Sequence, residues 1–496
     1  MSSYMITWAK HHFLLLLLLL FLATRLINLT LLPIFSDEAN YLDWGWRGLH
    51  GVPFHSLYDA KQPLLMWLFG LGEEIFPDPL FGARFVSTLT GLASILAVYA
   101  LAVRLFDKTT AYLSVLFYTF IPFFIFFDRQ ALMESSLTAV GLWTFYFLLK
   151  FFSRPRLLPA LVIGVLLGLG FFIKTSAAVF ILAFALIVLL GRSWKLLTLS
   201  LASAIAFLLV DSPLLFQSLF WSTFTRNSQY SFTLPELLHF PLLTWLTHLY
   251  INFQILLINF TPLVLLFILV GLIRIRLPRL YYYWLFIPLI IFSLTSRTAG
   301  YLSFRYLTPF IPLFIFPLAA YLKSRRILLI LTLALPIIAA VTLIFSPVSY
   351  FQIKSRLTPY SYISDYVTGF DTGYQVNALV SRLDTLTGNQ PSYIAMAVHA
   401  FNPEAALLAY YRKSSLLTPV FLDAKLFPAD LSSRYDCLSV NQPLYFVAKL
   451  NDTAGLAKFL TPVTVVKNSY NPDYSTIYTL KTNCPPDRTA NISPTQ

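Results

Sequence analysis

The chain has 496 residues, of which 57% are hydrophobic and 11% are charged. This composition excludes an ordinary soluble enzyme and indicates a membrane protein. A formal net charge of +13 is also typical of proteins that bind nucleic acid. Most of the basic excess, however, lies in short loops between apolar segments, where membrane orientation and anionic lipid headgroups account for it. We therefore expect no nucleic-acid partner.

Apolar segments long enough to cross a bilayer recur through the first 346 residues and then stop. We predict about eleven membrane spans, each near the length of roughly 20 residues that a helix needs to cross. The first segment lacks a following small-x-small cleavage site, which predicts a retained helix rather than a signal peptide. The spans are expected near 13–32, 84–105, 110–127, 136–152, 157–173, 175–191, 196–216, 251–273, 280–296, 305–322 and 326–346.

Basic residues gather in alternate connections between these segments, which the positive-inside rule assigns to the cytoplasm. With a cytoplasmic amino terminus and an odd number of spans, residues 33–83 and everything after 346 are predicted to lie outside. The basic residues that set this orientation are Lys10, Arg104, Lys108, Lys150, Arg154, Arg156, Arg192, Lys195, Arg274, Arg276, Arg279, Lys323, Arg325 and Arg326.

The first outside loop, 33–83, contains an amphipathic stretch, "DEANYLDWGWRGL". Its spacing predicts a helix lying along the membrane interface, with Asp37, Tyr41 and Trp44 on one face and Glu38 about 100° away. Acidic side chains near hydrocarbon are costly unless they are paired. Asp37 and Glu38 are therefore candidates for a functional site.

The outer ends of other spans carry further acids and bases. Each cation alone fits a snorkelling side chain, but outside loops should be poor in Lys and Arg, so the shared location indicates a site. Cations hold phosphate, and a carboxylate can take a proton from an attacking group. The pattern predicts glycosyl transfer from a lipid-phosphate sugar. The residues concerned are Lys61, Asp128, Arg129, Glu134, Lys174, Arg305 and Tyr306.

The tail, 347–496, differs in composition and predicts a small α/β domain outside the membrane. Strand-like runs such as "SYIAMAVHA", "PLYFVAKL" and "STIYTLK" alternate with helical runs such as "PEAALLAYYRK" and "DTAGLAKFL". We predict a structural or acceptor-docking role for this domain, after a membrane module that covers 1–346. Cys437 and Cys484 both lie in this outside segment, where an oxidising compartment permits a disulfide, and two free thiols are the alternative.

No CxxC, HExxH, GxxxxGK[ST] or GxGxxG motif occurs, so no metal or nucleotide site is predicted. The stretches described above resemble the C-type glycosyltransferases that use polyprenyl-phosphate sugars, including the protein mannosyltransferases and the lipid A aminoarabinose transferases. The resemblance covers about residues 10–330. It is carried, in this order, by "SDEANY", "KQPLLMWL", "ARFVSTLTGLASILAVYAL", "DRQALMESSLTA", "GLGFFIKTSA" and "FRYLTPFIPL".

The resemblance implies a role for each candidate residue. Asp37 corresponds to the general base, Glu38 is its neighbour in the acidic pair, and Glu134 is the second acid. The chain has Lys-Gln-Pro-Leu where the family has Lys-Pro-Pro-Leu. The residues implied to bind the lipid phosphate are Lys61, Lys174, Arg305 and Tyr306. Three further residues rank below these as site candidates: Asp128, Arg129 and Tyr41.

The resemblance also implies an inverting reaction without a cofactor. A divalent metal is the alternative, because some related oligosaccharyltransferases bind one through such carboxylates. The expected donor is a hexose, pentose or amino sugar on undecaprenyl or dolichyl phosphate, and the expected acceptor is a protein, a glycolipid or a glycan. Short loops favour a prokaryotic cell membrane.

Two other classes of protein compete with this interpretation. A multispan transporter of a lipid or sugar predicts charges near the bilayer midplane and related halves, whereas these charges gather at one face. A non-catalytic envelope scaffold would bind its partners through the tail.

Overall fold

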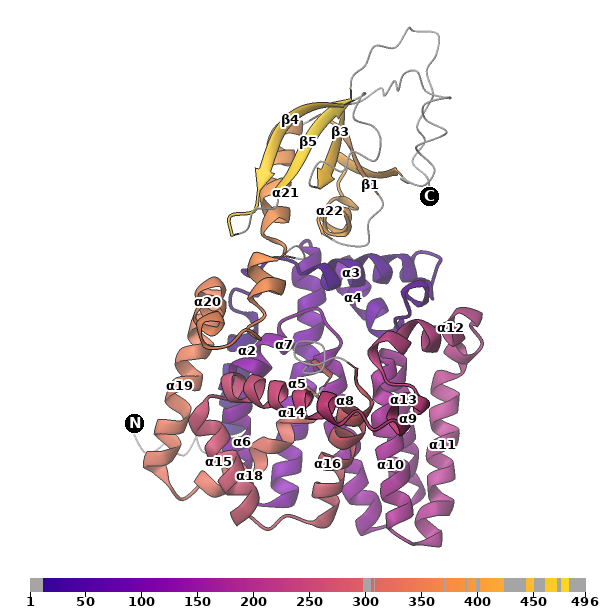
Figure 1. Cartoon of the computed structure of the whole chain (residues 1–496), viewed down its shortest axis with the longest axis vertical. Coiled ribbons are helices and arrows are strands. Elements are labelled where there is room, and N and C mark those ends of the chain that lie inside the picture. Colours follow the sequence, from indigo (N-terminus) through magenta and orange to yellow (C-terminus); the bar gives the residue numbers. More distant parts are fainter. Residues whose placement is uncertain are drawn as a thin grey trace. The chain divides into compact units, whose positions relative to one another are not determined.

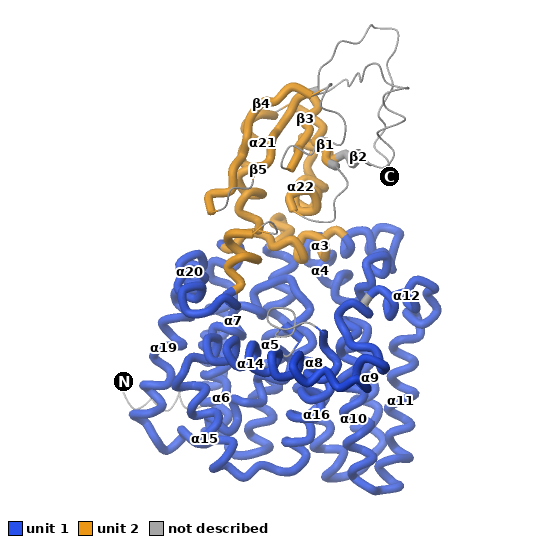
Figure 2. The backbone as a smooth tube through the Cα atoms, viewed as in Figure 1, with its two compact units in different colours: residues 1–31, 44–75, 81–361 blue, residues 32–43, 76–80, 362–496 orange. Residues whose placement is uncertain are grey.

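The computed structural model of the chain is shown in Figure 1. It describes residues 12–297, 305–306, 308–369, 372–388, 390–397, 402–422, 443–449, 460–470 and 474–480. The chain divides into two compact units, coloured in Figure 2, which we call the helical unit and the sheet unit. The helical unit comprises residues 1–31, 44–75 and 81–361, and the sheet unit comprises residues 32–43, 76–80 and 362–496.

The helical unit is built from helices and short 3-10 turns. In chain order they are α2 (Phe13–Leu26), η1 (His55–Asp59), α4 (Leu64–Ile75), α5 (Pro79–Leu105), α6 (Lys108–Phe120), α7 (Pro122–Asp128), α8 (Glu134–Ser153), α9 (Leu157–Ile173), η2 (Thr175–Ala177), α10 (Ala178–Leu190), α11 (Trp194–Leu215), α12 (Ser218–Arg226), η3 (Asn227–Tyr230), α13 (Leu234–Leu238), α14 (Leu242–Phe260), α15 (Pro262–Arg274), α16 (Arg279–Thr295), η4 (Ile311–Phe314), α18 (Ile315–Leu322), α19 (Arg326–Phe345) and α20 (Pro347–Leu357). Helix α3 (Ser36–Leu49) begins in the sheet unit and ends in the helical unit, and the first two residues of α5 also belong to the sheet unit.

The chain is a polytopic helical membrane protein. Among the described residues, five helices are long and apolar enough to cross a membrane, namely α5, α8, α11, α14 and α19, and the bent pair α6 and α7 is a sixth candidate. Shorter apolar helices, including α2, α9 and α16, lie at other predicted spans. The full set of eleven crossings stays a prediction.

Two predicted spans are divided in the structure. The segment 110–127 is broken between α6 and α7, which are bent by 68° relative to one another. The segment 251–273 is divided between α14 and α15 at Thr261, which has a φ of 69°. Pro262 then starts α15, because proline lacks the N–H that a continuous helix would need. Figure 1 shows α14 lying crosswise to α9, α10 and α11, so this region is not one straight crossing.

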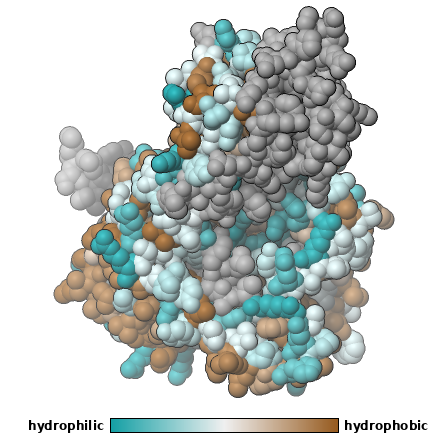
Figure 3. All heavy atoms as spheres, turned by 45° about the horizontal axis from the view of Figure 1, so that its top comes forward, coloured by the Kyte–Doolittle hydropathy of each residue, from teal (hydrophilic) through white to brown (hydrophobic). Residues whose placement is uncertain are grey.

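Close helix packing and an apolar exterior both follow from the sequence. A Cβ on Gly164 would lie 2.2 Å from the Ser203 carbonyl oxygen, so glycine lets α9 and α11 approach closely. Large apolar side chains are exposed along α19, including Ile327, Ile330 and Ile338. Figure 3 shows apolar surface over much of the helical unit, as expected where lipid replaces water.

The sheet unit contains a five-stranded sheet in the order β2-β1-β3-β5-β4. Strand β1 is parallel to β2 and β3, whereas β5 is antiparallel to β3 and β4. Its core includes Leu379, Leu383, Ile394, Met396 and Leu407. The elements are η5 (Ser364–Thr368, a π-helical turn), α21 (Tyr374–Thr387), β1 (Ser392–Ala397), α22 (Glu404–Tyr411), β2 (Leu417–Leu422), β3 (Leu444–Lys449), β4 (Leu460–Lys467) and β5 (Tyr474–Leu480).

The observed unit has the α/β content that the tail predicts. The three strand-like runs coincide with β1, β3 and β5, and "PEAALLAYYRK" coincides with α22. The run "DTAGLAKFL", apart from its last residue, and both cysteines lie outside the described residues. The sheet unit resumes at residue 362, and α20, which follows residue 346, belongs to the helical unit.

Candidate functional site

Glu134 is the centre of a buried ion-pair cluster in the helical unit. It is the first residue of α8 and is 1% exposed. Its Oε1 accepts hydrogen bonds from Lys174 Nζ at 2.9 Å and from Arg305 Nε at 3.1 Å. A second nitrogen of Arg305 donates to Oε2 at 3.5 Å. A buried carboxylate needs such partners, and it in turn fixes the two cationic side chains.

Lys174 connects this cluster to Tyr306. The residue ends α9 with extended backbone angles, so the chain leaves the helix at the lysine. Its Nζ lies 4.2 Å from the centroid of the Tyr306 ring, a cation–π contact. The Tyr306 ring is in turn 5.3 Å from the ring of Phe292, between centroids. Predicted residues from three distant segments are thus brought together.

Lys61 follows a tight turn at the end of η1. Ala60 adopts a left-handed φ of 58°, and the Lys61 N–H donates to the carbonyl oxygen of Ser56 at 3.0 Å. Pro63 restricts Gln62 to an extended backbone before α4 begins. Across the described part of the chain, the Lys61 ammonium forms no ion pair.

A cavity of about 320 Å³ in the helical unit is lined by three of the predicted phosphate-binding residues, Lys61, Lys174 and Tyr306. Through the ion pair of Lys174, the cavity is connected to Glu134 and Arg305. Two lysines and apolar walls suit an anion that carries an apolar group. The apolar and aromatic lining includes Met133, Leu182, Phe224, Ile291 and Phe292.

One rim of the cavity is a short antiparallel contact between two loops. Ser231 pairs with Ser296, and the Phe232 N–H donates to the Thr295 carbonyl oxygen at 2.7 Å. Ser231, Thr295 and Ser296 all line the cavity. An ion pair between Arg297 and Glu236 joins the same two loops.

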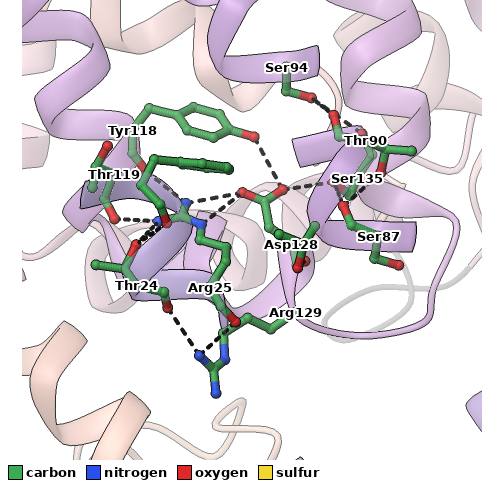
Figure 4. A network of polar contacts seen from close by, with 12 residues as sticks. Thr24, Arg25, Ser87, Thr90, Ser94, Tyr118, Thr119, Asp128, Arg129 and Ser135 are labelled. Atoms are coloured by element: carbon green, nitrogen blue, oxygen red, sulfur yellow. Dashed lines mark hydrogen bonds and ion pairs between the residues drawn. The ribbon is translucent and has the colours of Figure 1, made fainter. Parts of the chain in front are cut away.

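Asp128 belongs to a second buried network, shown in Figure 4. Its Oδ2 accepts from Arg25 at 3.0 Å, and its Oδ1 accepts from Ser135 at 2.8 Å and from Tyr118 at 3.3 Å. Arg25 also donates to the Thr119 carbonyl oxygen at 2.6 Å. Because Ser135 directly follows Glu134, this network ties α2, α6 and α7 to the first turn of α8.

Arg129 caps the carboxyl end of α2. Its guanidinium donates to the carbonyl oxygens of Thr24 and Arg25, both at 3.0 Å (Figure 4). It also donates to the carbonyl oxygen of Ile27 at 2.7 Å. The last carbonyls of a helix lack helical partners and favour a cation. The observed contacts of Asp128 and Arg129 are therefore with the protein itself, as expected of positioning groups.

The acidic pair lies in the part of α3 that belongs to the sheet unit. Glu38 is fully buried, and its Oε2 accepts a hydrogen bond from the Phe35 N–H at 2.9 Å. This is the contact of a carboxylate that caps a helix start. Asp37 is half-buried in the first turn, and Tyr41 is buried one turn later. The catalytic role of Asp37 stays a prediction from the resemblance.

Most of the lining residues were not predicted from the sequence, and two of them have a buried polar side chain with an atom that is unpaired among the described residues. Gln62 and Thr223 both line the cavity and are buried. Gln62 sits inside the quoted "KQPL" motif, where its departure from the family pattern was the available signal. Thr223 gave no signal, because a threonine on a short helix is common. Among the described residues there is no group of three His, Cys, Asp or Glu placed to hold a metal, and the cofactor prediction stays untested.

Sequence comparison connects this chain to known transferases. Residues 60–216, which include Lys61, Glu134 and Lys174, match the family of dolichyl-phosphate-mannose-protein mannosyltransferases. An undecaprenyl phosphate-alpha-4-amino-4-deoxy-L-arabinose arabinosyl transferase of Pseudomonas savastanoi pv. phaseolicola is 29% identical over 151 residues, covering 28% of each protein. The Pseudomonas aeruginosa protein of that name is 30% identical over 145 residues, covering 28% of this chain and 26% of the relative. The aligned part is thus about a quarter of each relative.

Structural comparison extends the likeness to nearly the whole chain. ArnT from Cupriavidus metallidurans in the apo state superposes with a TM-score of 0.56 at 14% identity, covering 95% of this chain and 98% of that one. The chain has the C-type glycosyltransferase fold. The structure of the same ArnT bound to undecaprenyl phosphate gives the same TM-score over 94% of this chain and 98% of that one. The predicted resemblance to C-type glycosyltransferases is therefore confirmed.

Proposed function

We propose that this chain is an integral-membrane glycosyltransferase that moves a sugar from a polyprenyl-phosphate donor to an acceptor hydroxyl or amine. One observation carries the proposal. Lys61, whose ammonium forms no ion pair with the described residues, lines the same cavity as Lys174 and Tyr306. An unpaired ammonium in a partly apolar cavity favours an anionic ligand. The names of the similar aminoarabinose transferases, which specify undecaprenyl phosphate, support a lipid phosphate.

The charges around the cavity suit a phosphate that leaves. Lys61, Lys174 and Arg305 are cationic and Glu134 is anionic, so the four formal charges give a net +2. When the bond from the anomeric carbon to the phosphate oxygen breaks, the electron pair stays on the phosphate. Its charge then grows from about −1 towards −2. Cations already in place stabilise that growing charge without reorganisation.

The acceptor completes a single displacement. Its oxygen or nitrogen forms the new bond to the anomeric carbon, and its proton passes to the Asp37 carboxylate, the base that the family resemblance implies. Glu134 forms ion pairs with Lys174 and Arg305, so its role in this scheme is to position these two cations. No cofactor takes part in the scheme.

A hollow in the sheet unit serves as a comparison. It has a volume of about 550 Å³ and is lined by Asn377, Ser381, Asp384 and Tyr410, among others. Its described wall holds a carboxylate and no cation, so a phosphate would be repelled there. The cavity of the helical unit is the better phosphate site, and we assign acceptor docking to the sheet unit.

The basic loops support a site on the outer face of the membrane, with the amino terminus in the cytoplasm and the sheet unit outside. Short loops support a prokaryotic cell membrane. The partners in this proposal are a polyprenyl-phosphate sugar, an acceptor protein, glycolipid or glycan, and membrane lipids, without nucleic acid.

A transfer assay tests the proposal. Purified protein in lipid nanodiscs is given a panel of radiolabelled polyprenyl-phosphate sugars, beside the Asp37→Asn variant. Wild type should release or transfer the sugar of at least one donor, and Asp37→Asn should lose about 10²–10⁴-fold in rate, the range for a general base. Full transfer by Asp37→Asn contradicts the base assignment, and transport of an intact donor across sealed vesicles contradicts the transferase.

A further inference from the structure

Two buried side-chain atoms, on residues that line the cavity of the helical unit, have no hydrogen-bond partner among the described residues. They are Gln62 Nε2 and Thr223 Oγ1. Gln62 is 1% exposed and Thr223 is fully buried, and both residues line the cavity. Buried polar groups in folded proteins are nearly always satisfied, and leaving one unsatisfied is costly. Two such atoms around one cavity indicate a polar ligand.

A hydrogen bond joins the two segments that carry these residues. Gln62 lies between Lys61 and Pro63, directly before α4. Thr223 lies on α12, and Arg226 of the same helix donates a hydrogen bond to the Tyr58 carbonyl oxygen in η1. The turn that presents Lys61 and Gln62 is thereby joined to the helix that presents Thr223.

The cavity is large enough for the group that these atoms would bind. At about 320 Å³, it holds about ten waters at roughly 30 Å³ each. Both atoms are covered in this structure, so each side chain must turn towards the cavity to form a hydrogen bond with a ligand.

The chemistry of the two groups defines the ligand. The Gln62 amide nitrogen is a donor, so it needs an oxygen acceptor, whereas the Thr223 hydroxyl both donates and accepts. Sugar hydroxyls meet both needs. The lysines of the same cavity hold the phosphate, and the next group along a polyprenyl-phosphate donor is its sugar.

We propose that Gln62 and Thr223 bind hydroxyl groups of the sugar and make the enzyme selective among donors. This inference rests on the proposed function. A site built to bond a hydroxyl rejects the analogue that lacks it, because the amide and hydroxyl are then left buried and unpaired. A deoxy donor should therefore bind more weakly to wild type than its hydroxylated parent.

The test compares the binding of three kinds of lipid to purified protein in nanodiscs. They are the best donor found in a panel of polyprenyl-phosphate sugars, the single-deoxy analogues of that donor, and the sugar-free polyprenyl phosphate. The variants are Gln62→Met and Thr223→Val, which keep the side-chain size. Each should weaken binding of the parent donor about 10-fold. Each should also bind one deoxy analogue as well as the parent, and should leave the sugar-free lipid unchanged.

Ser56→Ala is the matched control. Ser56 Oγ is also buried without a described partner, but Ser56 is not among the described lining residues of the cavity. Equal preference for parent and deoxy donors in wild type, or unchanged discrimination in both variants, would overturn this inference and leave the proposed function standing. If the variants lose as much affinity for the sugar-free lipid as for the parent donor, that result would also overturn it. Failure of wild type to bind any of these lipids would overturn the proposed function together with the inference.

Discussion

Replacing Glu134 with Gln removes the carboxylate that two cations share. Lys174 Nζ and Arg305 Nε lie 2.9 Å and 3.1 Å from the same oxygen, and the three side chains are 15%, 7% and 1% exposed for Lys174, Arg305 and Glu134. Breaking a buried ion pair by removing one partner costs about 3–5 kcal/mol, because it leaves uncompensated buried charge. Because Lys174 is partly exposed, water compensates for part of the free energy lost with its ion pair. We expect Glu134→Gln to destabilise the helical unit by about 3–5 kcal/mol in total.

The thermal unfolding midpoint of wild type and Glu134→Gln in matched nanodiscs measures this effect. Glu134→Asp is the conservative control, because it keeps the charge and shortens the side chain by one methylene, so a smaller decrease is expected. Binding of a polyprenyl phosphate should also weaken in Glu134→Gln, since Lys174 is no longer held in place. An unchanged midpoint together with unchanged binding would refute the role assigned to Glu134.

Two further predictions concern buried groups away from the cavity. Arg25→Met breaks the 3.0 Å pair with Asp128, whose partners are 0% and 2% exposed, and should lower the unfolding midpoint through a loss of about 3–5 kcal/mol. A midpoint equal to that of wild type would contradict the network. Burial lowers the pKa of Lys354, in α20, to about 7. Above that pH the unfolded chain binds the proton more tightly than the folded chain, so stability should rise with pH from about 7 towards 10. The Lys354→Met variant should lack that part of the rise, which unfolding midpoints at pH 6 and pH 9 would measure, and an identical pH profile would contradict the assignment.

Much of the fold was predictable because membrane spans and alternating strands leave strong local patterns. The runs that form β1, β3 and β5 could be predicted from the sequence, as could the apolar segments. The break at Thr261 was not predicted, and neither was the break between α6 and α7. A positive φ at a β-branched residue depends on tertiary packing rather than on local preference. The apolar character of residues 251–273 therefore led to the prediction of one continuous span.

The site was predictable in part. Lys61, Lys174 and Tyr306 were chosen from their outer positions and their motifs, and the structure places all three on one cavity. Asp128 and Arg25 are 103 residues apart, and no sequence pattern indicates such a pair. The sequence therefore kept Asp128 as a lower-ranked site candidate, while its observed partners are those of a positioning group.

The central claim is that the cavity holds the phosphate of a polyprenyl lipid through Lys61. The most direct test is the dissociation constant of sugar-free polyprenyl phosphate for wild type, Lys61→Ala and the control Lys323→Ala. Lys323 is an exposed lysine paired with Asp107. Losing a charge-assisted contact of about 1.5–3 kcal/mol should weaken binding about 10- to 100-fold in Lys61→Ala and leave the control unchanged. Equal affinity of wild type and Lys61→Ala would contradict the claim.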